Sequence, residues 1–239
     1  MKVAILAGGR GSRLGPITES KPKALVEIDG KPILWHIMKY YAHYGFKEFV
    51  IAIGYNKETF AISALTEEQN YSEQEWTIEL VDTGLATQTG GRIKRLASIM
   101  EGETFMLAWC DGLFDINLHE LLLFHTAHNK LVTMTAVHPP SRFGYLTLDG
   151  NRVARFSENP VLTDKWINGG LFVIEPGALE YIESDETQWE KGPLQRLVEE
   201  DELMAYRHRS FWQCMDTIHD KQVLEDIWKA DNAPWKVWS

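Results

Sequence analysis

Short apolar runs alternate with longer amphipathic segments along the first half of the chain. The runs at 2–6, 48–54 and 104–112 are apolar and short, which is typical of strands buried within a sheet. The segments 32–45 and 118–129 carry apolar residues at helical spacing and are predicted to be helices. Strands that alternate with helices predict a mostly parallel sheet covered by helices on both faces.

After residue 131 the pattern becomes richer in strands. The dipeptide Asp149-Gly150 separates two alternating segments and predicts a hairpin turn. No repeat, low-complexity tract or Pro/Gly/Ser linker divides the chain, so we predict one α/β domain over 1–239, with a Rossmann-like first half (about 1–115) and a strand-rich second half (about 116–239). Strand-like segments are found at 131–140, 145–158 and 169–176, and helical ones at 189–200 and 218–230.

Charge and composition narrow the class of partner. The 239 residues carry a formal charge of −10, which argues against nucleic acid and anionic membranes as partners. Residues 1–31 nevertheless hold six Lys and Arg against three Asp and Glu, which indicates a local anion site. No run of 18 apolar residues predicts a membrane span. Two cysteines favour a reducing compartment, and we expect a cytoplasmic protein.

The stretch "AILAGGRGSRLG" (4–15) places a glycine-rich turn directly after the first strand. It departs from the dinucleotide motif G-x-G-x-x-G because Leu14 stands at the third glycine, and it lacks the Gly-Lys-Ser/Thr of a P-loop. Glycines still let the backbone approach a phosphate, and Arg13 and Lys23 supply positive charge for its oxygens. We therefore predict a phosphate-binding turn of another kind.

Two aspartates follow predicted strands in distant parts of the chain. Asp111 comes after "FMLAW", and Asp216 comes after "FWQC" and before a predicted helix. Taken alone, each could equally be a helix cap or a turn residue. If both reach the same sheet edge, they suit Mg²⁺, which commonly takes one or two carboxylates plus substrate phosphates.

The stretch "ILAGGRGSRLGPITESKPKALVEIDGKPIL" resembles the signature of the nucleotidyltransferases that activate sugar 1-phosphates. The segments "VDTG", "TGGRIKR", "PPSRFGYL", "INGGLFV" and "FWQCMDTIHDK" are similar, within that family, to the glucose-1-phosphate cytidylyltransferases, and the resemblance runs nearly end to end. It implies a GT-A-like fold with a nucleotide-binding first half and an acceptor-binding second half. It also implies cytidylyl transfer from CTP to a phosphorylated acceptor, with Mg²⁺ as cofactor.

The same resemblance implies a set of site residues. Arg13, Lys23 and Asp111 would be catalytic, and Asp111 and Asp216 would hold the metal. The glycines at 90 and 91 would leave room for a flat base. The nucleotide would contact Leu6, Ala7, Gly8, Gly9, Gly11, Ser12, Arg13, Lys23, Thr89, Gly90, Gly91, Arg92 and Asp111, and the acceptor Arg142, Gly144, Glu158, Asn159, Asn168 and Gly169.

One departure concerns the acceptor. Family members usually read Glu-Lys-Pro where this chain reads Glu158-Asn159-Pro160, and that lysine holds the acceptor phosphate. Losing a charge-assisted bond costs about 1–3 kcal/mol. Either Lys165 or Arg142 replaces it, or the acceptor is not glucose 1-phosphate.

Three other hypotheses about the function remain. A glycosyltransferase could use Asp111 and Asp115, although that class typically has D-x-D and would leave the Arg–Lys signature unexplained. A non-catalytic nucleotide-binding module would tolerate losing Lys23 and the aspartates, all of which are present. The same chemistry could also serve a different sugar phosphate or a non-sugar phosphate.

Further side chains invite a simpler structural interpretation. His125 and His128 share a helix face, where exposed or capping histidines are expected rather than a metal pair. Cys110 and Cys214 are expected to be small buried residues at strand ends. The aromatic segment "APWKVWS" (233–239) favours a subunit contact, and we expect a homo-oligomer.

Overall fold

The computed structural model describes residues 1–60, 76–139, 143–158 and 165–238. Its centre is a seven-stranded sheet in the order β12-β8-β11-β6-β1-β4-β5. Only β11 runs against its neighbours in this sheet, so the predicted mostly parallel sheet is confirmed. The strands are β1 (Lys2–Leu6), β4 (Glu48–Ile53), β5 (Thr77–Asp82), β6 (Phe105–Trp109), β8 (Val132–Val137), β11 (Ile167–Ile174) and β12 (Leu203–Arg207).

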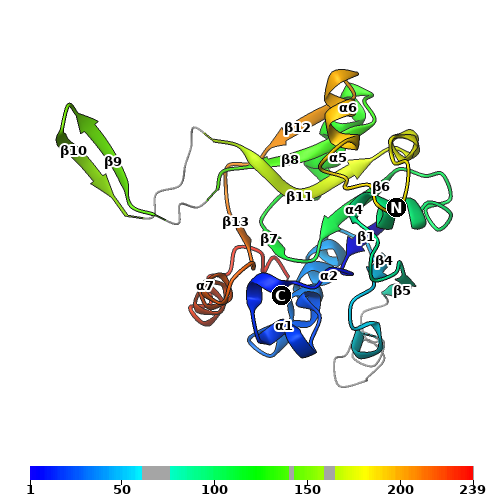
Figure 1. Ribbon diagram of the computed structural model, residues 1–239, viewed down its shortest axis with the longest axis horizontal. Helices are drawn as coiled ribbons and strands as arrows, with labels where there is room; N and C mark the ends of the chain where they lie inside the picture. The colour runs from blue at the N-terminus through cyan, green and yellow to red at the C-terminus, as the bar shows by residue number, and fades with distance from the viewer. Residues whose placement is uncertain (61–75, 140–142, 159–164, 239) are drawn as a thin grey trace.

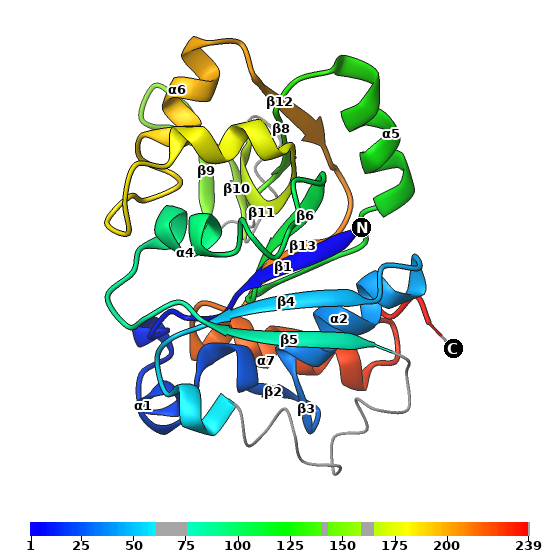
Figure 2. The same ribbon diagram turned by 90° about the vertical axis from the view of Figure 1, so that its right-hand side faces the viewer.

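The strand order contains a reversal point beside β1. The chain moves outward from β1 to β4 and β5, and then returns to place β6 on the other side of β1 (Figure 2). Loops after β1 and β6 therefore leave the sheet in opposite directions and open a crevice, where ligands of such sheets bind. The predicted strands at 2–6, 48–54 and 104–112 are confirmed, while β5 is an edge strand that the apolar pattern missed.

Each of the four segments predicted to be helical contains a helix, with one boundary shifted, and two further short helices at 17–20 and 89–95 were not predicted. The segment predicted as a helix from 189 starts at Pro193, because Trp189 is buried as a turn residue and Gly192 takes a φ of 132° that ends the turn. The helices are α1 (Ile17–Ser20), α2 (Ile33–His43), α4 (Thr89–Arg95), α5 (Leu118–His128), α6 (Pro193–Glu199) and α7 (Ile218–Lys229), with 3₁₀ turns at Ser12–Leu14, Lys23–Leu25 and Pro176–Tyr181.

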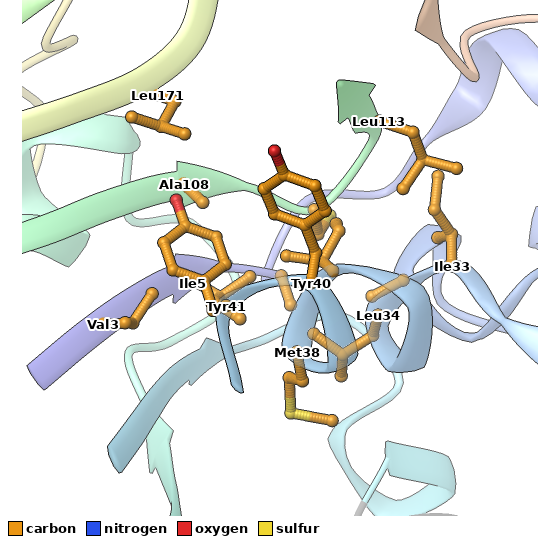
Figure 3. Close-up of a cluster of buried hydrophobic side chains, with 14 of the residues drawn as sticks. Val3, Ile5, Ile33, Leu34, Met38, Tyr40, Tyr41, Ala108, Leu113 and Leu171 are labelled. Carbon is orange, nitrogen blue, oxygen red and sulfur yellow. The ribbon is translucent and has the colours of Figure 1, made fainter. Parts of the chain in front are cut away.

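Both faces of the sheet are buried, each in its own hydrophobic core. In β1, Val3 and Ile5 face the core beneath α2, α5 and α7, whereas Ala4 and Leu6 face the core beneath α4 and α6. Figure 3 shows Tyr40 and Tyr41 of α2 lying against Ala108 and the β1 side chains. A strand buried on both sides must be apolar throughout, which explains why the strands read as continuous apolar runs.

Three small sheets complete the fold. The predicted hairpin turn at 149–150 is confirmed and joins β9 (Tyr145–Asp149) to β10 (Arg152–Ser157), which reach away from the main sheet (Figure 1). A short pair, β7 (Gly112–Phe114) and β13 (Trp212–Cys214), joins the middle of the chain to its C-terminal part. The third pair is β2 (Glu27–Ile28) with β3 (Lys31–Pro32). None of the helices in the described ranges has the length and apolar character that crossing a bilayer demands.

The C-terminal aromatic residues pack within the chain. Trp235 is fully buried, stacks on Trp228 and Phe211, and donates its indole N–H to Nδ1 of His36 at 3.4 Å. Burial lowers the pKa of His36 to about 4, so this imidazole is neutral at physiological pH. The segment that suggested a subunit contact therefore anchors the chain's own C-terminus.

We expect Trp235→Ala to lower the free energy of unfolding by about 3–5 kcal/mol, because it removes a large buried ring from this cluster. Leu123→Ala is the control, since Leu123 is 69% exposed and its loss should change stability by about 0.5 kcal/mol or less. Urea denaturation followed by far-UV circular dichroism measures both. Equal stabilities of the two variants would contradict the packing described here.

Candidate active site

A cavity of about 810 Å³ lies at the carboxyl ends of β1, β5 and β6, on the reversal point of the sheet. The glycine-rich turn after β1 forms one wall, and the segment between β5 and α4 forms another. Of the sequence-predicted site residues, nine line it: Leu6, Gly8, Gly9, Gly11, Arg13, Lys23, Thr89, Arg92 and Asp111. Asp216 contacts two of these residues, Arg13 and Lys23, and the other predicted residues in the described ranges are not part of the lining.

Steric contacts require glycine at two positions of the turn. Gly11 adopts a φ of 63°, and a Cβ there would lie 2.8 Å from Cβ of Lys23. At Gly8 a Cβ would lie 2.1 Å from Nη1 of Arg92. The turn accommodates the Lys23 and Arg92 side chains because it has no side chain at positions 8 and 11.

Lys23 lies at the centre of a group of charges. Its ammonium donates to Oδ2 of Asp111 and to Oδ1 of Asp216, both at 2.7 Å. Arg13 donates from Nη1 to Oδ2 of Asp216, also at 2.7 Å. Burial works to lower the pKa of Lys23, but the charge of Asp111 and the hydrogen bonds to both carboxylates outweigh it and hold the pKa above its usual value. Lys23 is therefore a permanent cation.

Backbone pairing brings the two distant aspartates together. Strands β7 and β13 pair Gly112 with Cys214, and the Met215 N–H donates to the Asp111 carbonyl at 2.8 Å. Asp216 then precedes α7, whose first turn closes with a capping box between Thr217 and Asp220. Asp220 also accepts from the Asp216 N–H at 3.1 Å, which fixes that residue at the sheet edge.

The two cysteines flank these carboxylates. Burial, followed by the charge of a neighbouring aspartate, raises the pKa of Cys110 and of Cys214 to about 12 each. Both stay neutral thiols at physiological pH and are free. Cys110 is buried at a strand end, as expected, whereas Cys214 is only half-buried.

Arg92 is buried against the cavity wall. It is 5% exposed, and its Nη1 donates to Oγ1 of Thr83 at 2.5 Å and to the Ile53 carbonyl at 3.3 Å. Burial, followed by the charge of Arg95, lowers its pKa below the ordinary value. Arg92 thus presents a guanidinium to the cavity from a fixed position.

The structure gives Gly90 and Gly91 different neighbours from those expected. Neither lines the cavity, and a Cβ at these positions would lie 2.7 Å from the Thr187 carbonyl oxygen and 2.5 Å from Asp185, respectively. The glycines therefore make room for the 185–187 backbone rather than for a flat base. Ala7 and Ser12 also lie outside the cavity lining.

None of the predicted acceptor residues in the described ranges lines this cavity. Gly144 and Glu158 flank the β9–β10 hairpin, where a Cβ on Gly144 would lie 2.7 Å from the Phe156 ring. Asn168 and Gly169 form an irregularity in β11, where Oδ1 of Asn168 accepts from the Gly170 N–H at 2.8 Å. The predictions for Arg142 and Asn159 fall outside the described residues.

The histidine pair on α5 is not exposed as expected. His125 is 2% exposed, and both rings contact Oγ1 of Thr133, at 2.8 Å for His125 and 2.7 Å for His128. The Lys130 N–H donates to Nδ1 of His128, so Nε2 of that ring donates to Thr133, which in turn donates to His125. His125 then donates to Glu175 at 3.1 Å. The pair holds α5 on the sheet and binds a hydroxyl rather than a metal.

Several cavity residues were missed from the sequence. Thr87 and Gln88 follow β5 as a second strand-to-helix turn, a signal that Gly84 and the following helix could have supplied. Glu190 lies a hundred residues away and accepts from Oγ1 of Thr89 at 2.7 Å, with no local pattern to mark it. The missed lining residues are Arg10, Leu85, Ala86, Thr87, Gln88, Trp109, Cys110 and Glu190.

Comparison with known proteins agrees with this geometry. The family model described as nucleotidyl transferase matches residues 2–228, so the chain belongs to the nucleotidyl transferase family and is an enzyme of that class. It is 44% identical over 256 aligned positions to the glucose-1-phosphate cytidylyltransferase of Salmonella typhi, with all of both chains covered. It is 38% identical to the "Probable glucose-1-phosphate cytidylyltransferase" of Bacillus subtilis (strain 168), again over all of both chains.

Solved structures confirm the fold. UDP-glucose pyrophosphorylase complexed with UDP-glucose superposes with a TM-score of 0.74 at 15% identity, covering 96% of this chain and 98% of that one. HddC from Yersinia pseudotuberculosis gives a TM-score of 0.72 at 20% identity, covering 95% and 99%. The predicted GT-A-like arrangement and the resemblance to sugar-1-phosphate nucleotidyltransferases are both confirmed.

We expect Gly11→Ala to lower kcat/KM for the nucleotide by about tenfold or more, because the new Cβ displaces Lys23 from the carboxylates. Gly102→Ala is a matched control: Gly102 has a similar φ of 74°, but a Cβ there would meet nothing within 4 Å. Both variants should lose about 1–2 kcal/mol of stability from backbone strain. Steady-state kinetics and urea denaturation separate the two effects, and equal kcat/KM values would refute the steric role of Gly11.

Proposed function

We propose that the chain transfers a cytidylyl group from CTP to glucose 1-phosphate, giving CDP-glucose and pyrophosphate. The choice of these substrates is supported by the full-length identity to proteins named for that reaction. The chemistry is supported by one observation above all: Lys23 and Arg13 meet Asp111 and Asp216 at the mouth of the glycine-rich turn. Transfer to phosphorus needs such positioned charges more than it needs covalent chemistry.

Each group of the site has a role in this proposal. Backbone N–H groups of the turn at 8–13 bind phosphate oxygens, which the glycines allow to approach closely. Lys23 and Arg13 neutralise the negative charge that develops at the α-phosphate. Arg92 presents guanidinium donors to the nucleotide from the cavity wall.

The residues present fit a divalent cation. Oδ2 of Asp111 and Oδ1 of Asp216 both lie 2.7 Å from the Lys23 ammonium, so the two oxygens converge on one point that a positive group already occupies. We propose that these two carboxylates hold Mg²⁺ together with the nucleotide phosphates, because hard oxygen ligands are what this ion prefers. When bound, Mg²⁺ would supply Lewis-acid stabilisation of the leaving pyrophosphate.

The reaction requires no general base. The attacking group is a phosphate oxygen that is already ionised, so no proton has to be removed from it. The raised pKa of Cys110, about 12, also keeps that lining thiol neutral. The chain's residues therefore bind, orient and neutralise charge, and none has to move a proton.

The hypothesis that the chain is a glycosyltransferase has little support. Asp115 does not line the cavity; it accepts from Oγ of Ser210 at 2.6 Å and pairs with His208 at 2.8 Å. A different acceptor stays the second candidate on one observation, the asparagine at position 159.

We expect pyrophosphate release in the presence of Mg²⁺ with CTP and glucose 1-phosphate, and not with UTP, dTTP or GTP. Lys23→Met tests whether turnover depends on this site. It should lower kcat by about 10²–10³-fold, as the loss of one charge-stabilising donor does. Turnover with CTP and only another sugar phosphate would make Asn159 a mark of altered specificity. No turnover with any pair would refute the enzymatic proposal.

We also propose that the protein is a cytoplasmic homo-oligomer. Its two free cysteines are compatible with a reducing compartment. The hairpin supports self-association because Leu146, Leu148, Val153 and Phe156 share one face and each is more than half exposed. The register shift between Val153 and Arg155 keeps Phe156 on that face. A lone two-stranded ribbon is marginal in water, and a second copy offers the same face for isologous packing.

We expect sedimentation velocity to give a mass above the 27.4 kDa of one chain. Phe156→Asp should shift the equilibrium toward the monomer, because a charge on the apolar face opposes its burial. Thr147→Asp, on the opposite face of the same strand pair, is the control and should leave the mass unchanged. A monomeric wild-type protein would contradict this assignment.

A further inference from the structure

Two positive and two negative side chains at one end of the cavity pair with one another and have no net charge. Lys23 and Arg13 bring two positive charges, and Asp111 and Asp216 bring two negative charges. Three contacts of 2.7 Å link them, and both oxygens of Asp216 are used. The Lys23 and Asp216 side chains are only 10% and 13% exposed, so the contact between them is shielded from water.

These contacts conflict with the roles that the reaction requires. Nucleotidyl transfer needs the two cations on phosphate oxygens and the two carboxylates on the metal. Here each carboxylate holds a cation of the chain instead. The Lys23 ammonium occupies the point where Asp111 Oδ2 and Asp216 Oδ1 converge, so a divalent cation and this ammonium cannot both lie there.

We infer that Lys23 and Arg13 exchange partners during binding: they leave Asp216 and Asp111 for the nucleotide phosphates as a divalent cation takes over the two carboxylates. This inference rests on the proposed function, whose site it uses. A divalent cation without nucleotide would have to displace the buried ammonium of Lys23 from the carboxylates. A nucleotide without metal would draw the two cations away and leave both carboxylates unpaired, which is strongly unfavourable for buried charges. Binding of metal and nucleotide is therefore mutually dependent.

The structure separates the parts that move from those that stay. The aspartate backbones are fixed by the Met215–Asp111 hydrogen bond and by the Asp220 contact to the Asp216 N–H. The Arg13 side chain is 70% exposed, and its one described hydrogen bond is the contact to Asp216. Lys23 carries its charge on a flexible four-carbon stem. The cations can turn toward phosphate while the carboxylates keep their place.

The first experiment measures Mn²⁺ binding to the protein without nucleotide, by electron paramagnetic resonance of the free ion. We expect Lys23→Met to bind Mn²⁺ about tenfold or more tightly than wild type, because the competing ammonium is gone. Arg10→Met is the matched control: Arg10 lines the same cavity and contacts the Tyr55 ring, and it has no described ion pair with either aspartate. It should change the affinity by less than about threefold, through long-range charge alone.

Equal affinities of Lys23→Met and wild type would overturn the inference, and so would an equal gain in both variants. Circular dichroism of each variant verifies folding. A second measurement avoids substitution altogether: wild-type protein is titrated with α,β-methylene-CTP in Mg²⁺ and in EDTA. We expect binding to be about tenfold or more tighter with Mg²⁺, and equal binding would also overturn the exchange.

The experiments distinguish failure of the proposed exchange from failure of the proposed function. Mn²⁺ binding involves no turnover, so tighter binding by Lys23→Met would stand even if no nucleotide and sugar phosphate react. Conversely, turnover with CTP together with metal-independent nucleotide binding would keep the proposed function and reject the exchange.

Discussion

The site depends on one backbone contact between segments that lie far apart in sequence. The Met215 N–H bonds to the Asp111 carbonyl, continuing the pairing of β7 with β13. Without it, Asp216 would have no defined position relative to the main sheet, and Lys23 would be a buried cation with one partner instead of two. Because a buried cation loses stabilisation when one of its two carboxylates is removed, the position of Lys23 and the pairing of the two short strands support each other.

The sheet order explains why the charges meet at this edge. The reversal beside β1 opens a crevice between the loops that follow β1 and β6, and these loops carry Arg13 and Asp111. The β5–α4 segment closes the crevice, with Thr89 held by Glu190. The apolar central strands thus support the site from below, and Arg13, Lys23, Asp111 and Asp216 meet at one edge of the sheet.

The sequence was most informative where the information is local. Apolar runs predicted β1, β4 and β6, and the glycine turn with Arg13 and Lys23 does line the cavity. The sequence also singled out Asp111 and Asp216, because each comes shortly after a strand, and in the structure both carboxylates meet Lys23. Local patterns cannot show which distant backbone a residue meets, so Gly90 was assigned to a base although it packs on the Thr187 carbonyl.

Burial was the second limit, since it is set by tertiary packing. The pattern around His125 is the same for an exposed helix face as for one packed on a sheet, and only Thr133 and Glu175 decide between them. In the sequence, Trp235 is likewise only an aromatic residue near the C-terminus, and its burial follows from the stacking of Trp228 and Phe211 on its ring in the fold.

The charge of the first 31 residues gains a different meaning once the fold is known. Read along the chain, Arg13 and Lys23 make a positive site on an acidic protein. In the folded chain Asp111 and Asp216 neutralise them completely, so the cavity attracts a triphosphate only weakly through these two cations. In the exchange that we propose, a divalent cation on the carboxylates would add two positive charges and free the charges of Lys23 and Arg13. The attraction for the nucleotide would then arise together with the catalytic arrangement, and a site built this way would favour the metal–nucleotide complex over either component alone.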